Sequence, residues 1–87
     1  MAAIRRFPTA ITPRQLEVLT NLSLREQWSI GEVASALGVS SAAATKAVAR
    51  LERKGLVSRA IDVVDRRCVN VRVTRAGNEI IRQGVRR

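Results

Sequence analysis

The 87-residue sequence contains no histidine and no tyrosine, and it has one cysteine, one tryptophan and one phenylalanine. Without histidine and with a single thiol, it lacks the residues for a zinc site and for a Ser-His or Cys-His catalytic arrangement. Its seven acidic residues are scattered, and no glycine-rich phosphate loop is present. We therefore expect no cofactor, no metal and no enzymatic activity.

Long apolar runs are also missing. No stretch approaches the roughly 20 residues that span a bilayer, and Arg5 and Arg6 are not followed by the apolar region of a secretory signal. The single cysteine, Cys68, cannot form an intramolecular disulfide, as is common in a reducing compartment. We expect a cytoplasmic protein, an inert rather than redox-sensing Cys68, and no membrane partner.

Positive charge is what the sequence has in excess. Sixteen Lys and Arg residues against seven Asp and Glu give a net charge of +9, which favours an anionic partner. The basic residues do not lie opposite a broad aromatic or leucine-rich helical face, so nucleic acid is favoured over a membrane surface. A hydrophobic fraction of 46% is too high for a disordered basic tail, and the length suits one domain.

The first half of the sequence predicts two capped helices after an N-terminal arm, residues 1–11; the domain itself is assigned to residues 12–87. Thr12, Pro13 and Gln15 form a helix start with a hydroxyl cap, and the helix is expected over residues 13–24. Ser29 and Glu32 form a second capping box. Trp28, just before it, is expected to pack rather than to stack on bases.

A turn of only three residues, 38–40, separates the second helix from the third, a spacing typical of a helix-turn-helix. Ser40 is the expected cap of the third helix, which runs from Ser41 to Lys54. Its predicted buried stripe is Ala44, Ala47, Val48 and Leu51, and its opposite face is short-chained at the start and basic further on. Short side chains allow the close approach that reading base edges in a major groove requires.

After Gly55 the apolar period changes from 3.6 to 2. Three valines alternate with other residues over 68–74, which indicates a half-buried strand, and 57–61 is its less regular partner, with the polar segment 62–67 between them. Thr74 then caps a last helix. The predicted fold class is α+β, mostly α: a winged helix-turn-helix with a three-helix core, a β-hairpin wing and a short C-terminal helix.

Six segments resemble the successive motifs of the MarR family of bacterial transcriptional regulators: 16–19 (LEVL), 31–34 (GEVA), 37–40 (LGVS), 48–57 (VARLERKGLV), 62–67 (DVVDRR) and 73–77 (VTRAG). The resemblance implies DNA binding, dimerisation, and arginines of the wing in a minor groove with Asp65 orienting one of them. Family members are longer, with a helix before this region and long dimer-forming helices after it. This chain has an arm and one short helix at those places.

Two groups of residues are the candidate sites. Thr45 and Arg50 are expected to contact bases, Lys46 and Arg53 to contact phosphates, and Ser40 to cap the helix and contact a phosphate. For the helix, the alternative is that these residues form an ordinary solvated face without DNA contacts. For the wing, the alternative is a turn in which Asp65 simply pairs with an arginine. The full DNA-binding set is Ser40, Ser41, Ala42, Thr45, Lys46, Arg50, Arg53, Asp65, Arg66 and Arg67. The dimerisation set is Ile4, Phe7, Ile11, Ile80, Ile81 and Val85.

We therefore predict a sequence-specific double-stranded DNA-binding regulator, most simply a repressor, that reads the major groove with residues 41–54 and the minor groove with the wing. A homodimer is expected, because one recognition helix reads too few base pairs for a regulator's specificity. The alternative is a winged-helix module that binds proteins or binds DNA non-specifically. The sequence names no small-molecule effector.

Overall fold

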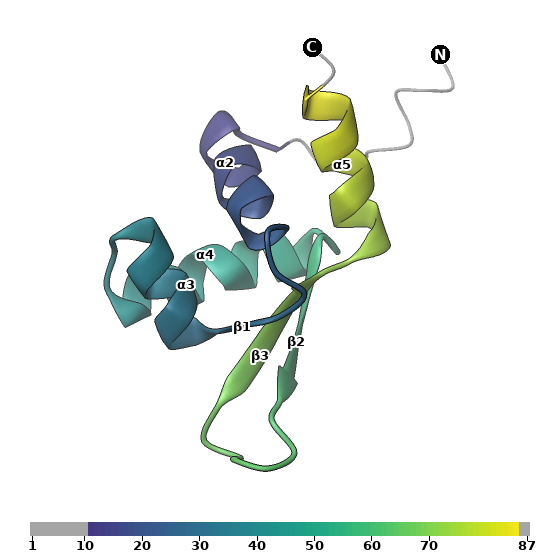
Figure 1. Ribbon diagram of the computed structural model, residues 1–87. Coiled ribbons are helices and arrows are strands. Elements are labelled where there is room, and N and C mark those ends of the chain that lie inside the picture. The colour runs from purple at the N-terminus through teal and green to yellow at the C-terminus, as the bar shows by residue number, and fades with distance from the viewer. Residues whose placement is uncertain (1–10, 86–87) are drawn as a thin grey trace.

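The computed structural model describes residues 11–85, in which helices and a small sheet follow one another in the predicted order (Figure 1). The elements are α2 (Pro13–Leu22), β1 (Trp28–Ser29), α3 (Ile30–Leu37), α4 (Ser41–Arg53), β2 (Val57–Ile61), β3 (Val69–Val73) and α5 (Arg75–Val85). This is a winged helix-turn-helix, and the predicted fold class is confirmed.

Side-chain caps determine where the first two helices begin. The Thr12 hydroxyl accepts the N–H of Gln15 at 3.1 Å, and the Gln15 side chain accepts the N–H of Thr12 at 3.2 Å. Ser29 and Glu32 make the same reciprocal pair at 3.1 and 2.9 Å. Both predicted capping boxes are therefore present, and each satisfies N–H groups that a helix start leaves unpaired.

The turn between α3 and α4 depends on Gly38, which has a φ of 67° at the end of α3. Few residues other than glycine adopt this left-handed conformation, so the chain reverses within three residues. Ser40 then caps α4 by accepting the N–H of Ala43 at 3.1 Å. The first predicted helix ends two residues earlier than expected, at Leu22 rather than Leu24, and α4 ends at Arg53 with Lys54 as its cap.

The sheet has three antiparallel strands in the order β1-β3-β2. The predicted hairpin is present, and in it Val57 pairs with Val73 and Ile61 with Val69. The strand that the sequence analysis missed is β1, where Trp28 pairs with Val71. Two residues are too few to produce a detectable period.

The core lies where α2, α3 and α4 meet the base of the sheet. Its most completely buried large side chains are Leu19, Leu22, Val33, Val48, Leu51 and Val71. Trp28 is also buried, and its indole Nε1–H donates to the carbonyl of Leu22 at 2.8 Å, which confirms its packing role. Ala47, predicted to be buried, is only half-buried, because it lines a pocket described below.

One junction joins the end of α4, the base of the wing and the start of α5. The Thr74 hydroxyl donates to the carbonyl of Gly55 at 2.7 Å and accepts the N–H of Gly77 at 3.1 Å. A Cβ atom at Gly77 would clash with the carbonyl oxygen of Leu56 and would lie 2.7 Å from Val73 Cγ1. Backbone segments are therefore in direct contact here, without a side chain between them.

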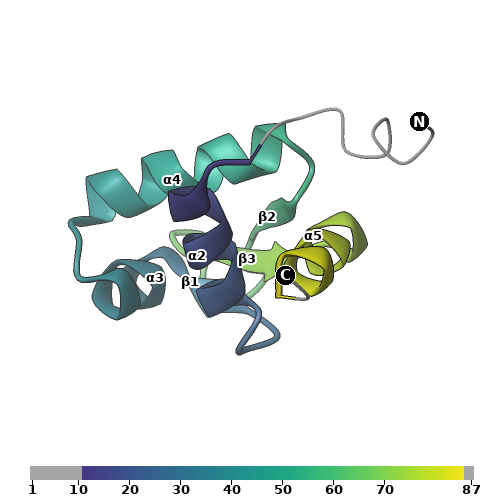
Figure 2. The same cartoon turned by 90° about the horizontal axis from the view of Figure 1, so that it is seen from above.

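At the end opposite the wing, α2 and α5 lie side by side, as Figures 1 and 2 show. A Cβ atom at Gly84 would lie only 2.8 Å from Leu16 Cδ2, which shows how closely these helices pack. Ile80 belongs to the core, and Ile11 and Ile81 pack against it. Of the predicted arm, residues 1–11, only Ile11 lies within the described residues; Ile4 and Phe7 lie outside them, as does the side chain of Val85.

Candidate nucleic-acid interface

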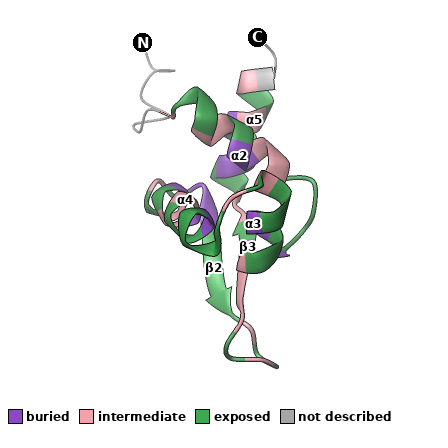
Figure 3. Ribbon diagram, turned by 90° about the vertical axis from the view of Figure 1, so that its left-hand side faces the viewer, coloured by how far each residue is buried: buried purple, intermediate pink, exposed green. Residues whose placement is uncertain are grey.

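The helix α4 has one face in the core and one in solvent. Ala44, Val48 and Leu51 are buried, whereas the predicted contact residues of this helix are exposed: Ser41, Ala42, Thr45, Lys46, Arg50 and Arg53. Figure 3 shows this division along the helix. The core therefore holds α4 in place while its outer face stays accessible, and this face contains every helical residue of the predicted DNA-binding set.

The first turns of that outer face bear only short side chains. Ser41, Ala42 and Ala43 are exposed, and no long side chain among them would keep another surface at a distance. Since Ser40 uses its hydroxyl as the helix cap, the N-terminal turn is both small and fixed in direction. A helix end of this kind can approach base edges closely, and its dipole favours a nearby phosphate.

Further along α4 the outer face becomes cationic. Lys46, Arg50 and Arg53 recur at intervals of four and three residues, so they follow one side of the helix. The neighbouring carboxylate of Glu52 is occupied by Arg59 from β2, whose Nη2 lies 2.8 Å from Glu52 Oε1. This ion pair neutralises the acidic group beside the cationic stripe.

The wing presents its own basic group at the tip. Arg66 is exposed, and the side chain of Arg67 is 91% exposed. Asp65 Oδ1 accepts the backbone N–H of Arg67 at 3.1 Å and lies 3.3 Å from its Nε. The backbone hydrogen bond is the main reason that the pKa of Asp65 lies below its ordinary value, and the Arg67 side chain lowers this pKa further. Asp65 therefore contacts both the backbone and the side chain of Arg67.

The thiol of Cys68 also contacts this aspartate. Its Sγ lies 3.5 Å from Asp65 Oδ2 and donates to it. The negative carboxylate raises the pKa of Cys68, mainly through this hydrogen bond. A thiol with a raised pKa forms less of the reactive thiolate, which supports the expectation of an inert cysteine.

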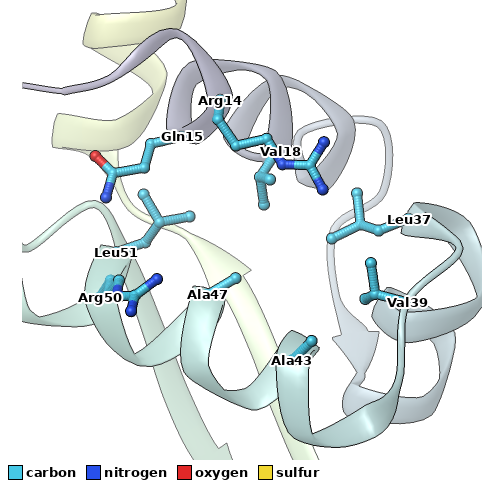
Figure 4. A pocket seen from close by; sticks show the side chains of 9 residues that line it. All are labelled: Arg14, Gln15, Val18, Leu37, Val39, Ala43, Ala47, Arg50 and Leu51. Carbon is cyan, nitrogen blue, oxygen red and sulfur yellow. The ribbon is translucent and has the colours of Figure 1, made fainter.

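A pocket of about 200 Å³ lies between α2, the end of α3 and α4 (Figure 4). Its apolar surface comes from Val18, Leu37, Val39, Ala43, Ala47 and Leu51, and it is also lined by Gln15. Arg14 and Arg50 both extend toward the space between the helices (Figure 4). Arg50 therefore lies where the exposed face of α4 meets the lining of this pocket.

The sequence analysis did not identify Arg14 as part of this region. It lies in the first turn of α2, 66% exposed and 3.7 Å from Glu17, and nothing in its local pattern distinguishes it from a solvated helical charge. Only the crossing of α2 over α4 brings it into the lining of the same pocket as Arg50.

Of the predicted dimerisation residues, the structure describes the side chains of Ile11, Ile80 and Ile81. Ile80 is 8% exposed and completes the core, so it offers little surface to a second copy. Ile11 and Ile81 are half-buried, which leaves part of each side chain available.

The described residues contain neither a metal-binding cluster nor a membrane-spanning helix. Within residues 11–85, no three His, Cys, Asp or Glu side chains gather to hold a metal ion. None of the helices in this described part is long and apolar enough to cross a membrane.

Comparisons with known proteins agree on one family. Residues 11–69 match the model of the MarR family. The chain is 34% identical over 68 residues to the HTH-type transcriptional repressor MdtR of Bacillus subtilis. It is 37% identical over 73 residues to the uncharacterized HTH-type transcriptional regulator YdgJ of the same species. These matches cover 78% and 84% of this chain, but the chain spans only 44% of each of these curated relatives.

Solved structures give the same result. A variant of MarR from E. coli, complexed with operator DNA, matches with a TM-score of 0.80 and 33% identity over 87% of this chain and 54% of that one. The S. aureus MepR–DNA complex matches with a TM-score of 0.81 and 25% identity, covering 94% of this chain and 66% of that one.

Proposed function

The chain belongs to the MarR family, and from this premise we propose that it is a sequence-specific double-stranded DNA-binding regulator of transcription. In this proposal the outer face of α4 enters the major groove, and the tip of the wing reaches the adjacent minor groove. The observation that carries the proposal is the outer face of α4, where short side chains precede a cationic stripe on a helix fixed by the core.

The residues of the interface fall into groups with different roles in this proposal. Thr45 and Arg50 read base edges, Lys46 and Arg53 neutralise phosphates, and Arg67 enters the minor groove with Asp65 holding its guanidinium. Ser40, Ser41 and Ala42 allow the start of the helix to approach the DNA, and Arg66 adds charge at the wing. A narrow minor groove attracts guanidinium groups because it concentrates negative potential.

Repression is the simplest mode of action, because a protein bound across a promoter excludes polymerase. The relative MdtR is a repressor, and two structural neighbours are complexes with DNA. We place the protein in the cytoplasm, on the bacterial nucleoid, with binding rather than catalysis as its activity.

We further propose that the functional unit is a two-fold homodimer. Two copies would read an inverted repeat whose half-site centres lie about 34–36 Å apart, one turn of DNA. The exposed parts of Ile11 and Ile81 would form the contact together with Ile4, Phe7 and Val85. Ile80 would support it from the core.

Selection of bound duplexes from a random pool tests the proposal. The wild type is expected to enrich an inverted repeat, and Thr45→Ala should change which base pairs are preferred. Lys46→Ala should weaken binding to all duplexes alike and lower the slope of log affinity against log salt by about 1. Arg82→Ala is the matched control, because it removes one charge from α5 at the far end of the molecule.

Other outcomes distinguish the alternatives. Binding without any enriched sequence would indicate a non-specific accessory protein. Failure to bind any duplex would leave the protein-interaction module, whose largely apolar contacts respond little to salt.

A further inference from the structure

The tip of the wing carries two apolar side chains that nothing in the described chain covers. Val63 is 89% exposed and Val64 is 93% exposed. Two other large hydrophobic residues of the described part are strongly exposed: Ile61, on the same hairpin, and Leu24, in the loop after α2. Uncovered apolar side chains are therefore concentrated on the wing.

The turn that bears these valines is held by a set of local hydrogen bonds. The N–H of Val64 donates to Asp62 Oδ1 at 3.3 Å, and the N–H of Asp62 donates to the carbonyl of Cys68 at 2.9 Å. The N–H of Cys68 in turn donates to the carbonyl of Asp65 at 2.9 Å. The valines thus project from a turn with a defined shape, which also bears Arg66 and Arg67.

We propose that Val63 and Val64 contact the deoxyribose rings that form the walls of the DNA minor groove, beside the arginines of the wing. This inference rests on the proposed function and adds an uncharged component to it. The wing projects from the body of the protein (Figure 1), so its tip can enter a groove without the rest of the hairpin.

Three considerations favour DNA sugars as the partner. The adjacent arginines and the net charge of +9 bring the tip to an anionic surface. The sugar edges of a minor groove present C–H groups, which suit short aliphatic side chains. Valine also has little rotational freedom at χ1, so it loses little entropy on contact.

The size of the patch disfavours other partners. A stable protein interface buries about 800 Å² on each partner, far more than two valines supply. A membrane-binding surface needs a broad apolar helical face, and the hairpin has none.

A sugar contact has a distinctive salt dependence. Burying aliphatic surface releases no counterions, whereas pairing an arginine with a phosphate does. The valines should therefore raise affinity equally at all salt concentrations, without changing the slope of log affinity against log salt.

The experiment measures affinity for a mixed-sequence DNA duplex across a range of salt concentrations. The double variant Val63→Ser/Val64→Ser should bind about tenfold more weakly at every salt concentration, with the wild-type slope. Val63→Ile/Val64→Ile should bind at least as well as the wild type. Leu24→Ser is the matched control, since it replaces an exposed apolar residue far from the wing tip, and it should bind as the wild type does.

Three results would overturn the inference. If the serine variant bound like the Leu24→Ser control, the valines would not touch the DNA, although the proposed function would stand. A changed slope would mean that the arginines, not the valines, account for the loss. If the wild type bound no duplex at any salt concentration, the proposed function would fail together with this inference.

Sedimentation without DNA is the final check, because exposed valines could also hold two copies together. The wild type and the serine variant should have the same mass. A lower mass for the variant would assign the valines to self-association instead.

Discussion

The two parts of the proposed interface, α4 and the tip of the wing, are positioned by different forces. Helix α4 is fixed by burial, because Ala44, Val48 and Leu51 pack into the core. In the segment from residue 62 to residue 67 no residue is buried, and hydrogen bonds within the turn give it its shape. The helix therefore depends on the whole fold, whereas the tip depends mainly on its own few residues.

This difference has a practical consequence for mutagenesis. A change in the core should impair α4 and the wing together, because both are attached to the same packed body. A change at the tip should alter DNA binding without altering the free energy of unfolding. Measurements of stability and of DNA binding on the same variants distinguish the two cases.

Leu51→Ala should destabilise the protein by about 2–5 kcal/mol, because it leaves a cavity under α4. Chemical denaturation measures the loss, and DNA binding should fall with the folded fraction. Leu24→Ala, at a residue 75% exposed, is the control and should change the free energy of unfolding by less than about 0.5 kcal/mol. Equal effects of the two substitutions would contradict the role assigned to the core.

Arg67→Ala should weaken binding to duplex DNA about tenfold at low salt and reduce the slope of log affinity against log salt by about 1. The midpoint of thermal unfolding should not change, because the side chain is almost fully exposed. A lowered melting temperature would show that the tip is coupled to the core after all.

Ser40→Ala should destabilise the protein by about 1 kcal/mol, since it removes the cap on the N–H of Ala43. Ser41→Ala serves as its control, because Ser41 is the first residue within the helix and does not cap it. Denaturant titration of both variants compares the neighbouring hydroxyls directly. A similar loss for Ser41→Ala would show that capping is not the cause.

The smallest expected effect is the loss of the Asp65 contacts at low pH. Because its folded-state pKa is lowered by the Arg67 N–H, Asp65 should keep its contacts as the pH falls through the ordinary aspartate range near pH 4. The contacts should be lost only when the pH falls through the lowered value. The amide resonance of Arg67, whose N–H donates to Asp65, reports this transition. A midpoint at or above the ordinary value would contradict the orienting role of Asp65, and Asp65→Asn should abolish the transition.

Most of the fold was predictable because its signals are local. Capping boxes at Thr12 and Ser29, the glycine at position 38 and the alternation of valines in β3 each act within a few residues. The hairpin was predicted for the same reason: β2 has the expected limits, and β3 is one residue shorter at each end than the alternation over 68–74 indicated.

The features that were missed depend on residues far apart in the sequence. β1 exists only because Trp28 lies beside Val71, and the pocket at Arg14 exists only because α2 crosses α4. Ile80 was assigned to a dimer surface on its apolar character, yet the fold uses it in the core. An apolar residue on an amphipathic helix does not reveal which neighbour will cover it.

The junction at Thr74 connects the wing and the end of α4 directly to the start of α5. One hydroxyl connects the end of α4 to the start of α5, and Gly77 lies directly against the backbone at Leu56. There is no compressible side chain between them to absorb a displacement. A displacement of the start of α5 would therefore act directly on the base of the wing and on the end of α4.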